Sequence, residues 1–270
     1  MPELPEVETT RRGIAPHIVG ERVANVLIRQ SKLRWEISPN LGQMLSGQTI
    51  TGVERRAKYL LINTKKGQVM IHLGMSGSLR VLDADVPAET HDHVDIVLQN
   101  DRLLRYRDPR RFGSIFWLDE YYEHSLLQNL GPEPLSPAFD ADYLFRVSRT
   151  RKAAIKSFLM DGRIVVGVGN IYANEALFIA GIRPGVAAGK PSKIRYQRLV
   201  NAIKQILSAA IDAGGTSLKD FVREDGSPGY FKQALSVYGR GGESCLVCNK
   251  VLKETRIGQR TTVYCPGCQS

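Results

Sequence analysis

The stretch that decides the fold is HVDIVLQNDRLLRYRD, residues 93–108. Branched and aromatic residues alternate with polar ones on either side of Asn100-Asp101, a pair that favours a tight turn. The pattern predicts an antiparallel hairpin. Further short segments rich in branched residues are separated by Gly, Asn, Lys and Asp, and they cover residues 23–29, 60–63, 69–73 and 78–82. So many short antiparallel strands predict a β-sandwich or flattened barrel.

On the C-terminal side of the strands, the sequence changes character at LGPEPLSP, residues 130–137, where three prolines indicate a linker. Apolar residues then recur at helical spacing, as in Ile155, Phe158 and Leu159, and again in Leu199, Ile203, Ile206, Ala210 and Ile211. Another helix is expected to begin at Asn170 and stop before Gly181. The sequence thus predicts an α+β chain with a catalytic β domain over 1–131, a linker and junction over 132–150, a helical domain over 151–235 and a cysteine-bearing tail over 236–270.

The composition points to a polyanionic partner. The 270-residue chain has a formal net charge of +10, and a basic excess of this size favours nucleic acid over mere solubility. No apolar run approaches the length of a membrane span. The first residues are acids and prolines, whereas a secretory signal needs a basic start and an apolar core, so we expect a cytoplasmic protein.

The four cysteines lie close together at the C-terminal end. Cys245 and Cys248 have two residues between them, as do Cys265 and Cys268, and sixteen residues separate the pairs. Two short-spaced thiolate pairs can complete a tetrahedral Zn²⁺ site with no open position for catalysis. We therefore expect one structural zinc. A redox dithiol is the minor alternative.

The chain begins MPELPEVET, residues 1–9. Removal of Met1 would leave Pro2 as a free secondary amine, which is nucleophilic near neutral pH because an α-amine titrates around pH 8. Attack on a sugar C1′ would give an iminium, a strong electron sink. The alternative is a plain helix start: Pro5 opens a helix expected to end near Pro16, and Glu3 and Glu6 match its dipole.

Two further groups of residues suggest contacts with DNA. In VVGVGNIYANEA, residues 165–176, Gly167 and Gly169 precede a helix and can cradle a phosphate. A dinucleotide cofactor is a poor alternative, because Tyr172 stands where that fingerprint needs Gly or Ala. Basic clusters with apolar tips surround Lys58, Met75 and Phe112, and apolar wedges beside arginines are suited to unstacking a base.

Taken together, these motifs closely resemble the bacterial formamidopyrimidine-DNA glycosylases along essentially the whole chain. The resemblance rests on MPELPEVET, RRAKYL, HLGMSGSLR, HDHVD, DPRRFG, LGPEPLS, VVGVGNIYANEALF, DGSPGYF, VYGR and the four-cysteine tail. It implies an N-terminal antiparallel β-sandwich with a leading helix, then a helical domain with a helix–two-turn–helix motif and a zinc-finger β-hairpin. It also implies a monomeric, nucleoid-associated enzyme that excises oxidised purines from double-stranded DNA and cuts the strand by β,δ-elimination.

The resemblance assigns roles residue by residue. Pro2 would be the Schiff-base nucleophile and Glu3 the acid that assists opening of the sugar ring. Lys58 would hold the phosphate beside the lesion and take part in proton transfer, and Arg260 would lie at the phosphates during elimination. Met75, Arg110 and Phe112 would fill the gap left by the flipped base. Contacts with the DNA backbone are implied for His72, His91, Arg151, Lys156 and Asn170.

Two alternatives remain from the sequence. The sister family, endonuclease VIII, acts on oxidised pyrimidines, but it typically has Gly where this chain has Leu4, and it lacks the matching wedge sequence. A non-catalytic zinc-finger DNA-binding protein explains the charge and the cysteines but leaves Pro2 and Glu3 without a role. The segment TSLKDFVREDGSPG, residues 216–229, corresponds to a loop that covers the flipped base and varies among relatives.

Overall fold

The structure is a computed structural model that describes residues 2–119, 124–214 and 235–270. It divides into two compact units, whose described parts are residues 2–119, 124–128 and 213–214 for the first and 129–212 and 235–270 for the second. The segment 216–229 lies outside the described residues.

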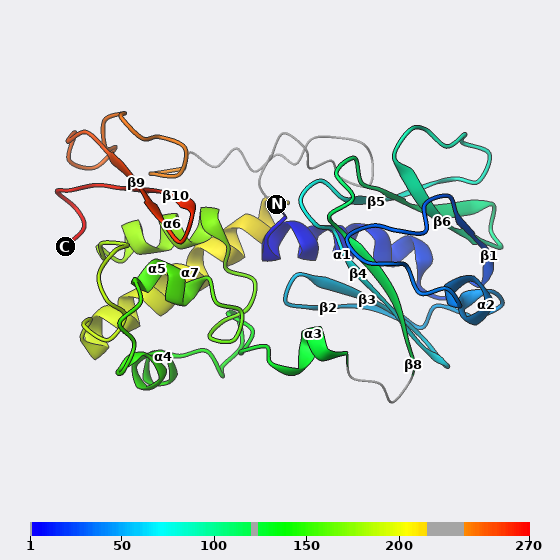
Figure 1. Cartoon of the computed structure of the whole chain (residues 1–270), viewed down its shortest axis with the longest axis horizontal. Helices are drawn as coiled ribbons and strands as arrows, with labels where there is room; N and C mark the ends of the chain where they lie inside the picture. The colour runs from blue at the N-terminus through cyan, green and yellow to red at the C-terminus, as the bar shows by residue number, and fades with distance from the viewer. Residues whose placement is uncertain (1, 120–123, 215–234) are drawn as a thin grey trace. The chain divides into compact units, whose positions relative to one another are not determined.

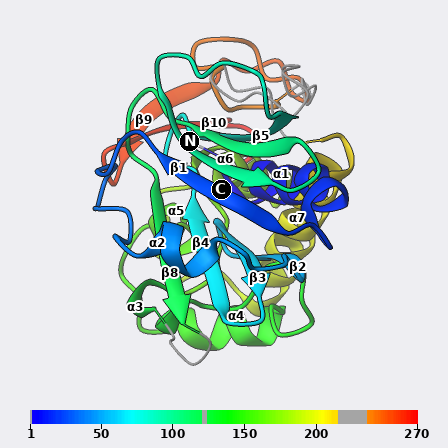
Figure 2. The same ribbon diagram turned by 90° about the vertical axis from the view of Figure 1, so that its right-hand side faces the viewer.

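The first unit is built from two four-stranded antiparallel sheets (Figures 1 and 2). One has the order β1(Val23–Ile28), β6(Asp92–Leu98), β7(Arg102–Arg107), β5(Ser78–Asp83), and the other β2(Gly52–Arg56), β3(Tyr59–Thr64), β4(Gly67–His72), β8(Ser114–Asp119). Residues from both sheets form one hydrophobic core, including Val26, Ile62, Ile96 and Ile115. The predicted antiparallel sandwich is confirmed.

The hairpin over residues 93–108 is formed by β6 and β7. Ile96 lies opposite Leu104, and both side chains are buried in the core. Their neighbours Asp95 and Arg105 face the other side of the sheet, where they form an ion pair. Asp101 completes the turn with a φ of 60°, a conformation that Asp tolerates better than most residues.

Helix α1(Leu4–Ile18) opens with the expected proline. Pro16 lies inside the helix, which ends two residues beyond it and so near the position predicted from the sequence. Ile14 and Ile18 are one turn apart and fully buried in the core. Burial of Ile18 supports the last turn despite the hydrogen bond that proline removes. Two short helices, α2(Leu41–Leu45) and α3(Ser125–Gln128), complete the described part of this unit.

The second unit is helical and carries a two-stranded hairpin. Its helices are α4(Ala141–Ser148), α5(Ile155–Leu159), α6(Asn170–Ile179) and α7(Lys193–Asp212), and the hairpin is β9(Lys253–Ile257) with β10(Arg260–Tyr264). The expected start of a helix at Asn170 and the apolar face of α7 are confirmed. Phe178 of α6 shares a small core with Leu252, Val263 and two cysteines, so this helix supports the cysteine-bearing tail.

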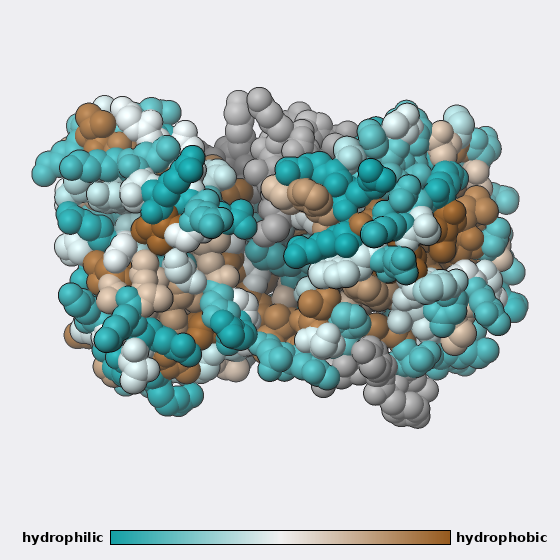
Figure 3. Space-filling view, in the orientation of Figure 1, coloured by the Kyte–Doolittle hydropathy of each residue, from teal (hydrophilic) through white to brown (hydrophobic). Residues whose placement is uncertain are grey.

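The surface shown in Figure 3 is largely hydrophilic, and the described helices are short or polar, as the charged composition of the chain suggests. On the face shown in Figure 3, hydrophilic side chains predominate on both units. Among the helices described, none has the length and apolar character needed to cross a bilayer.

Candidate active site and nucleic-acid interface

Pro2 and Glu3 lie buried at the start of α1. Glu3 is the N-cap, and its carboxylate accepts a hydrogen bond from the backbone N–H of Glu6. In return, the Glu6 carboxylate accepts one from the Glu3 N–H at 2.7 Å. This reciprocal capping box fixes the backbone directly after Pro2. The candidate nucleophile is therefore held on an ordered helix start.

A charged pair connects α1 to the turn that carries Lys58. Glu8 accepts a hydrogen bond from Arg55 Nε at 3.1 Å, and Arg55 Nη1 donates to the Ala57 carbonyl at 2.9 Å. Burial raises the pKa of Glu8, but the hydrogen bonds from Arg11 and Arg12, together with the charges of Arg11 and Arg55, lower it overall. The ionised carboxylate thus ties the helix of Pro2 to the turn between β2 and β3.

His72, at the end of β4, is positioned to donate a hydrogen bond. Its Nδ1 accepts the Gly74 backbone N–H at 3.0 Å, so the neutral ring carries its proton on Nε2. Burial lowers the pKa of His72 to about 4, and the positive charges of Lys58 and Arg34 add to this effect. At neutral pH the ring is an uncharged donor beside two cations, an arrangement suited to a phosphate oxygen.

The three residues expected to fill the gap of a flipped base come from two loops in close contact. A Cβ added to Gly74, which precedes Met75, would lie 2.4 Å from the Gly113 nitrogen and 2.7 Å from the Phe112 carbonyl oxygen. Only glycine permits this approach. Phe112 is 46% exposed, and the Arg110 guanidinium lies 4.9 Å from its ring centroid. The structure therefore brings the predicted wedge residues together.

Asp108 holds both wedge loops in place. Its fully buried carboxylate accepts hydrogen bonds from Ser76 Oγ at 2.7 Å, the Gly113 N–H at 2.9 Å and the Arg110 N–H at 3.3 Å. Its own N–H donates to the carbonyl of His91, an exposed residue. The sequence pattern DPRRFG alone does not indicate a role for this aspartate.

Strained backbone occurs at or beside several of the predicted site residues. Six non-glycine residues among those described have a positive φ, and five of them are site residues or neighbours of one: Ala57, His91, Arg111, Asn249 and Gln259. This conformation costs about 1–2 kcal/mol per residue, and such strain gathers at functional sites. Nothing in the sequence indicates it.

The second unit carries the remaining predicted contacts. Asn170 is the half-buried first residue of α6, and the N-cap before it is Gly169, which has no side chain to cap the helix. The positive end of the helix dipole can therefore meet a phosphate there. Arg151 and Arg260 are exposed, the latter at the start of β10.

Lys156 has a different environment from the other predicted contacts. Its side chain on α5 is fully buried, and its ammonium donates to the Thr261 carbonyl at 2.9 Å and to Thr262 Oγ1 at 2.7 Å. Both acceptors directly follow Arg260. In this structure the lysine thus connects α5 to the hairpin that carries Arg260.

We expect Lys156→Met to loosen this hairpin while keeping most of the buried volume. Two oxygen acceptors would lose a charged donor, and each such hydrogen bond contributes about 1.5–3 kcal/mol. Hydrogen exchange of the Thr262 and Val263 amides should speed up, and Lys152→Met, which changes an exposed lysine nearby, should leave it unchanged. Unaltered exchange in Lys156→Met would remove the lysine from this role.

Two consecutive buried residues of α6 were not identified from the sequence. Asn174 Oδ1 accepts the Val263 N–H of β10 at 3.0 Å. Glu175 accepts the N–H groups of Ser236, Val237 and Tyr238 at 2.7–2.9 Å. Their position in NEAL, at the centre of an otherwise apolar helix, was the available signal, because buried polar groups need partners.

The four cysteines form one cluster. Their sulfur atoms all lie within 4.8 Å of one another, with 3.9 Å between Cys245 and Cys268 and 3.3 Å between Cys248 and Cys265. Ligands around a tetrahedral zinc are about 3.8 Å apart, given a Zn–S bond of about 2.3 Å. Backbone N–H groups point at the sulfurs of Cys245 and Cys265 at 3.4 Å. The residues fit a metal ion held by four thiolates.

Comparisons with known proteins agree with this arrangement. The model of the formamidopyrimidine-DNA glycosylase N-terminal domain matches residues 1–115, and that of the formamidopyrimidine-DNA glycosylase H2TH domain matches residues 130–222. A formamidopyrimidine-DNA glycosylase of Stutzerimonas stutzeri is 60% identical over the whole of both chains, and one of Pseudomonas aeruginosa is 59% identical, also over the whole of both.

Solved structures lead to the same family. The MutM (Fpg) protein from Thermus thermophilus has a TM-score of 0.89 at 37% identity, covering 99% of this chain and 98% of its own. The G226P mutant of Lactococcus lactis Fpg, in complex with a DNA containing Fapy-dG, has a TM-score of 0.91 at 32% identity and covers 100% of both chains. The fold is that of a DNA glycosylase. This chain belongs to the formamidopyrimidine-DNA glycosylase family.

Proposed function

We propose that the protein is a base-excision-repair enzyme, a bifunctional DNA glycosylase and AP lyase for oxidised purines such as 8-oxoguanine and formamidopyrimidines. The observation that carries the proposal is the buried helix start, where Pro2 is fixed next to the capping carboxylate of Glu3. A capping box stabilises any helix start, so the match of this segment to the glycosylase family is what assigns it a catalytic role. Relatives crystallised on DNA with a Fapy-dG or an abasic site support it.

The reaction would begin with attack of the Pro2 nitrogen on the sugar C1′ of the flipped nucleotide. The bond between C1′ and the base breaks, and the base leaves with the electron pair and with the proton that the Pro2 nitrogen loses. Glu3 then protonates the ring oxygen as the sugar opens. The product is a positively charged iminium, which acidifies the neighbouring C2′ proton. Loss of that proton expels the 3′ phosphate, and a second elimination expels the 5′ phosphate.

Charged and polar side chains of both units would bind the phosphates. Lys58 and the neutral His72 would hold the phosphates at the lesion, with Lys58 also transferring protons, and Arg260 would stabilise the departing phosphates. His91, Arg151 and Asn170 would fix the backbone and orient the duplex. The ion held by the cysteines would be one structural Zn²⁺, which orders the hairpin of Arg260 and leaves no coordination position for substrate.

Borohydride trapping tests the proposal directly. Incubation with an 8-oxoguanine duplex and borohydride should join the protein covalently to DNA, because the reductant converts the iminium to a stable amine. An oxidised-pyrimidine duplex of the same sequence should be trapped more slowly. Faster trapping on the pyrimidine duplex would favour the endonuclease VIII type of specificity, and no trapping on either would favour a binding protein.

We expect Arg110 and Phe112 to contribute differently to recognition of the base opposite the lesion. Flipping a purine costs a few kcal/mol, which side chains that fill the vacancy partly recover. Arg110 can donate hydrogen bonds to N3 and O2 of an orphaned cytosine, whereas Phe112 supplies only apolar surface. Arg110→Ala should therefore narrow the preference for 8-oxoguanine opposite cytosine over adenine, and Phe112→Ala should slow both pairings by similar factors. Single-turnover cleavage of both pairings measures these effects. An unchanged ratio of the rates opposite cytosine and opposite adenine in Arg110→Ala would show that Arg110 does not recognise the opposite base.

A further inference from the structure

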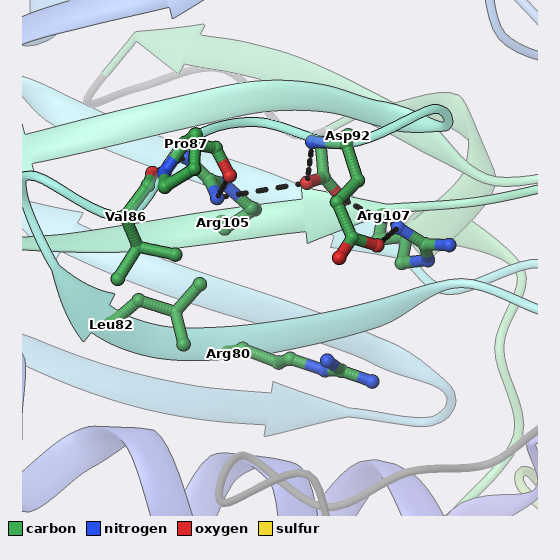
Figure 4. A pocket seen from close by; sticks show the side chains of 8 residues that line it. Arg80, Leu82, Val86, Pro87, Asp92, Arg105 and Arg107 are labelled. Carbon is green, nitrogen blue, oxygen red and sulfur yellow. Dashed lines mark hydrogen bonds and ion pairs between the residues drawn. The ribbon is translucent and has the colours of Figure 1, made fainter.

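A small pocket lies on the outer face of the β5–β7 sheet, away from the hydrophobic core (Figure 4). Its volume is about 120 Å³, and the loop between β5 and β6 forms one wall. Three arginines line it, Arg80 from β5 and Arg105 and Arg107 from β7, together with the carboxylates of Glu89 and Asp92. None of these five residues has a role in the proposed chemistry.

Arg105 builds the pocket and has its donors engaged. Its Nε and Nη2 bind the two oxygens of Asp95 at 2.9 Å. Its Nη1 and Nη2 also donate to the carbonyls of Pro87 and Val86 at 3.0 Å, which fastens the loop to the sheet. Hydrogen bonding and the charge of Asp95 raise the pKa of this guanidinium further. The pocket is therefore preformed.

The two carboxylates of the lining are likewise engaged. Arg107 Nη1 donates to Glu89 at 3.0 Å and to Asp92 at 3.3 Å. The second oxygen of Asp92 accepts the Glu89 backbone N–H at 2.8 Å and lies 3.6 Å from Arg105. Both acids therefore bind Arg107, while Arg105 is paired chiefly with Asp95.

Arg80 is the remaining cation. It lies directly opposite Arg105 in the pairing of β5 with β7, and like charges across strands repel. Its Nε is shielded from solvent and has no hydrogen-bond partner in the structure. Within the described parts of the chain, Arg80 forms no ion pair. A buried donor without a partner costs about 1–3 kcal/mol, which a bound acceptor would recover once the side chain turns its Nε towards the pocket.

We propose that this pocket is a binding site for a singly charged oxyanion of the phosphodiester class, with Arg80 as its principal ligand. With Asp95, which binds Arg105, and Arg29, which also binds Asp95, the network has four arginines and three carboxylates. The one remaining positive charge matches a monoanion better than a dianion. A cavity of ~150 Å³ holds a benzene molecule, so this one has room for a group of the size of phosphate. Arginine binds such oxygens with two parallel hydrogen bonds.

The position of the pocket favours DNA as the source of this group. Its rim residues Glu89 and Asp92 flank His91, the exposed residue expected to contact the backbone, and Arg107 directly precedes Asp108 of the wedge loop. This choice of source depends on the proposed function, whereas the existence of the oxyanion site does not. The other source of the oxyanion would be a free small molecule that carries a single negative charge.

Dimethyl phosphate tests the site without DNA, because it carries a single charge and has the two ester arms of a backbone phosphate. It should raise the thermal midpoint of unfolding beyond sodium chloride of equal ionic strength, since a ligand bound only by the native state stabilises it. Arg80→Gln should abolish this difference, and Arg80→Lys should retain part of it. Arg102→Gln removes the same charge from the end of β7 outside the pocket and should respond like the parent. An equal response in Arg80→Gln, or no response in the parent, overturns the proposal.

The salt dependence of duplex binding then identifies the source. If a DNA phosphate occupies the pocket, Arg80→Gln should lower the slope of log affinity against log salt by about one unit relative to Arg102→Gln. An unchanged slope together with a lost response to dimethyl phosphate would assign the site to a free small molecule. Borohydride trapping reports on the glycosylase separately, so failure of either idea can be recognised.

Discussion

Pro2→Gly should lose most of its glycosylase activity, by a factor on the order of 100 or more, the scale on which loss of a positioned catalytic group is felt. A primary amine can still form an imine, but that imine can lose its proton and become a weaker electron sink. Acetylation of the N-terminus, or retention of Met1, should abolish borohydride trapping while lesion binding persists. Single-turnover excision of 8-oxoguanine and trapping yield are the measurements.

Pro16→Ala provides a matched control for this experiment. It also removes a proline, but one inside α1 near the far end of the helix, so trapping should be unaffected. Peptide mapping of the trapped complex must locate the DNA on Pro2. Attachment to Lys58 instead would show that the lysine is the nucleophile.

Cys248→Ser should disorder the hairpin of Arg260 without unfolding the rest of the protein. Metal binding in small zinc modules contributes about 10–16 kcal/mol, far more than the two-stranded hairpin and its small core can supply alone. Zinc content should fall from one per chain towards zero, and affinity for lesion DNA should fall strongly. The core of the first unit includes none of the cysteines, so the sandwich should keep its melting behaviour.

Val247→Ala is the appropriate control for the cysteine variant. This side chain lies between the first two cysteines and is 72% exposed, so its loss should alter neither zinc content nor DNA binding. If metal-free Cys248→Ser protein bound and cleaved DNA like the parent, the ion would have no part in positioning Arg260.

Local patterns in the sequence predicted most of the architecture. The alternation around Asn100-Asp101 identified the central hairpin, and the spacing of the cysteines identified a cluster whose sulfurs do lie together. Strand β2, with sequence GVERR, was missed because one buried valine among charged residues gives no alternation. Strand β8 was missed despite its apolar sequence SIFWLD, and it pairs with β4 across more than forty intervening residues.

The connections that position the site could not be predicted, because they join residues far apart in the chain. The bond from Arg55 to Glu8 spans 47 positions, and that from Lys156 to Thr262 spans 106. Each depends on where the tertiary fold places a carboxylate or a carbonyl. The burial of Lys156 is an instance: a lysine in a basic sequence suggests a solvated cation, and only the packing of α5 against the hairpin shows otherwise.

The pair Asn174 and Glu175 makes helix α6 a shared support. The same helix begins with the glycine-capped end expected to meet a phosphate, and its middle fastens both β10 and the segment that leads into the cysteines. Two ligands that act on one rigid element are thermodynamically linked, and linkage is reciprocal. If bound DNA raises the affinity for the proposed zinc by some factor, bound zinc must raise the affinity for DNA by the same factor. Molecules bound to DNA would then keep the metal at free zinc concentrations at which unbound molecules lose it.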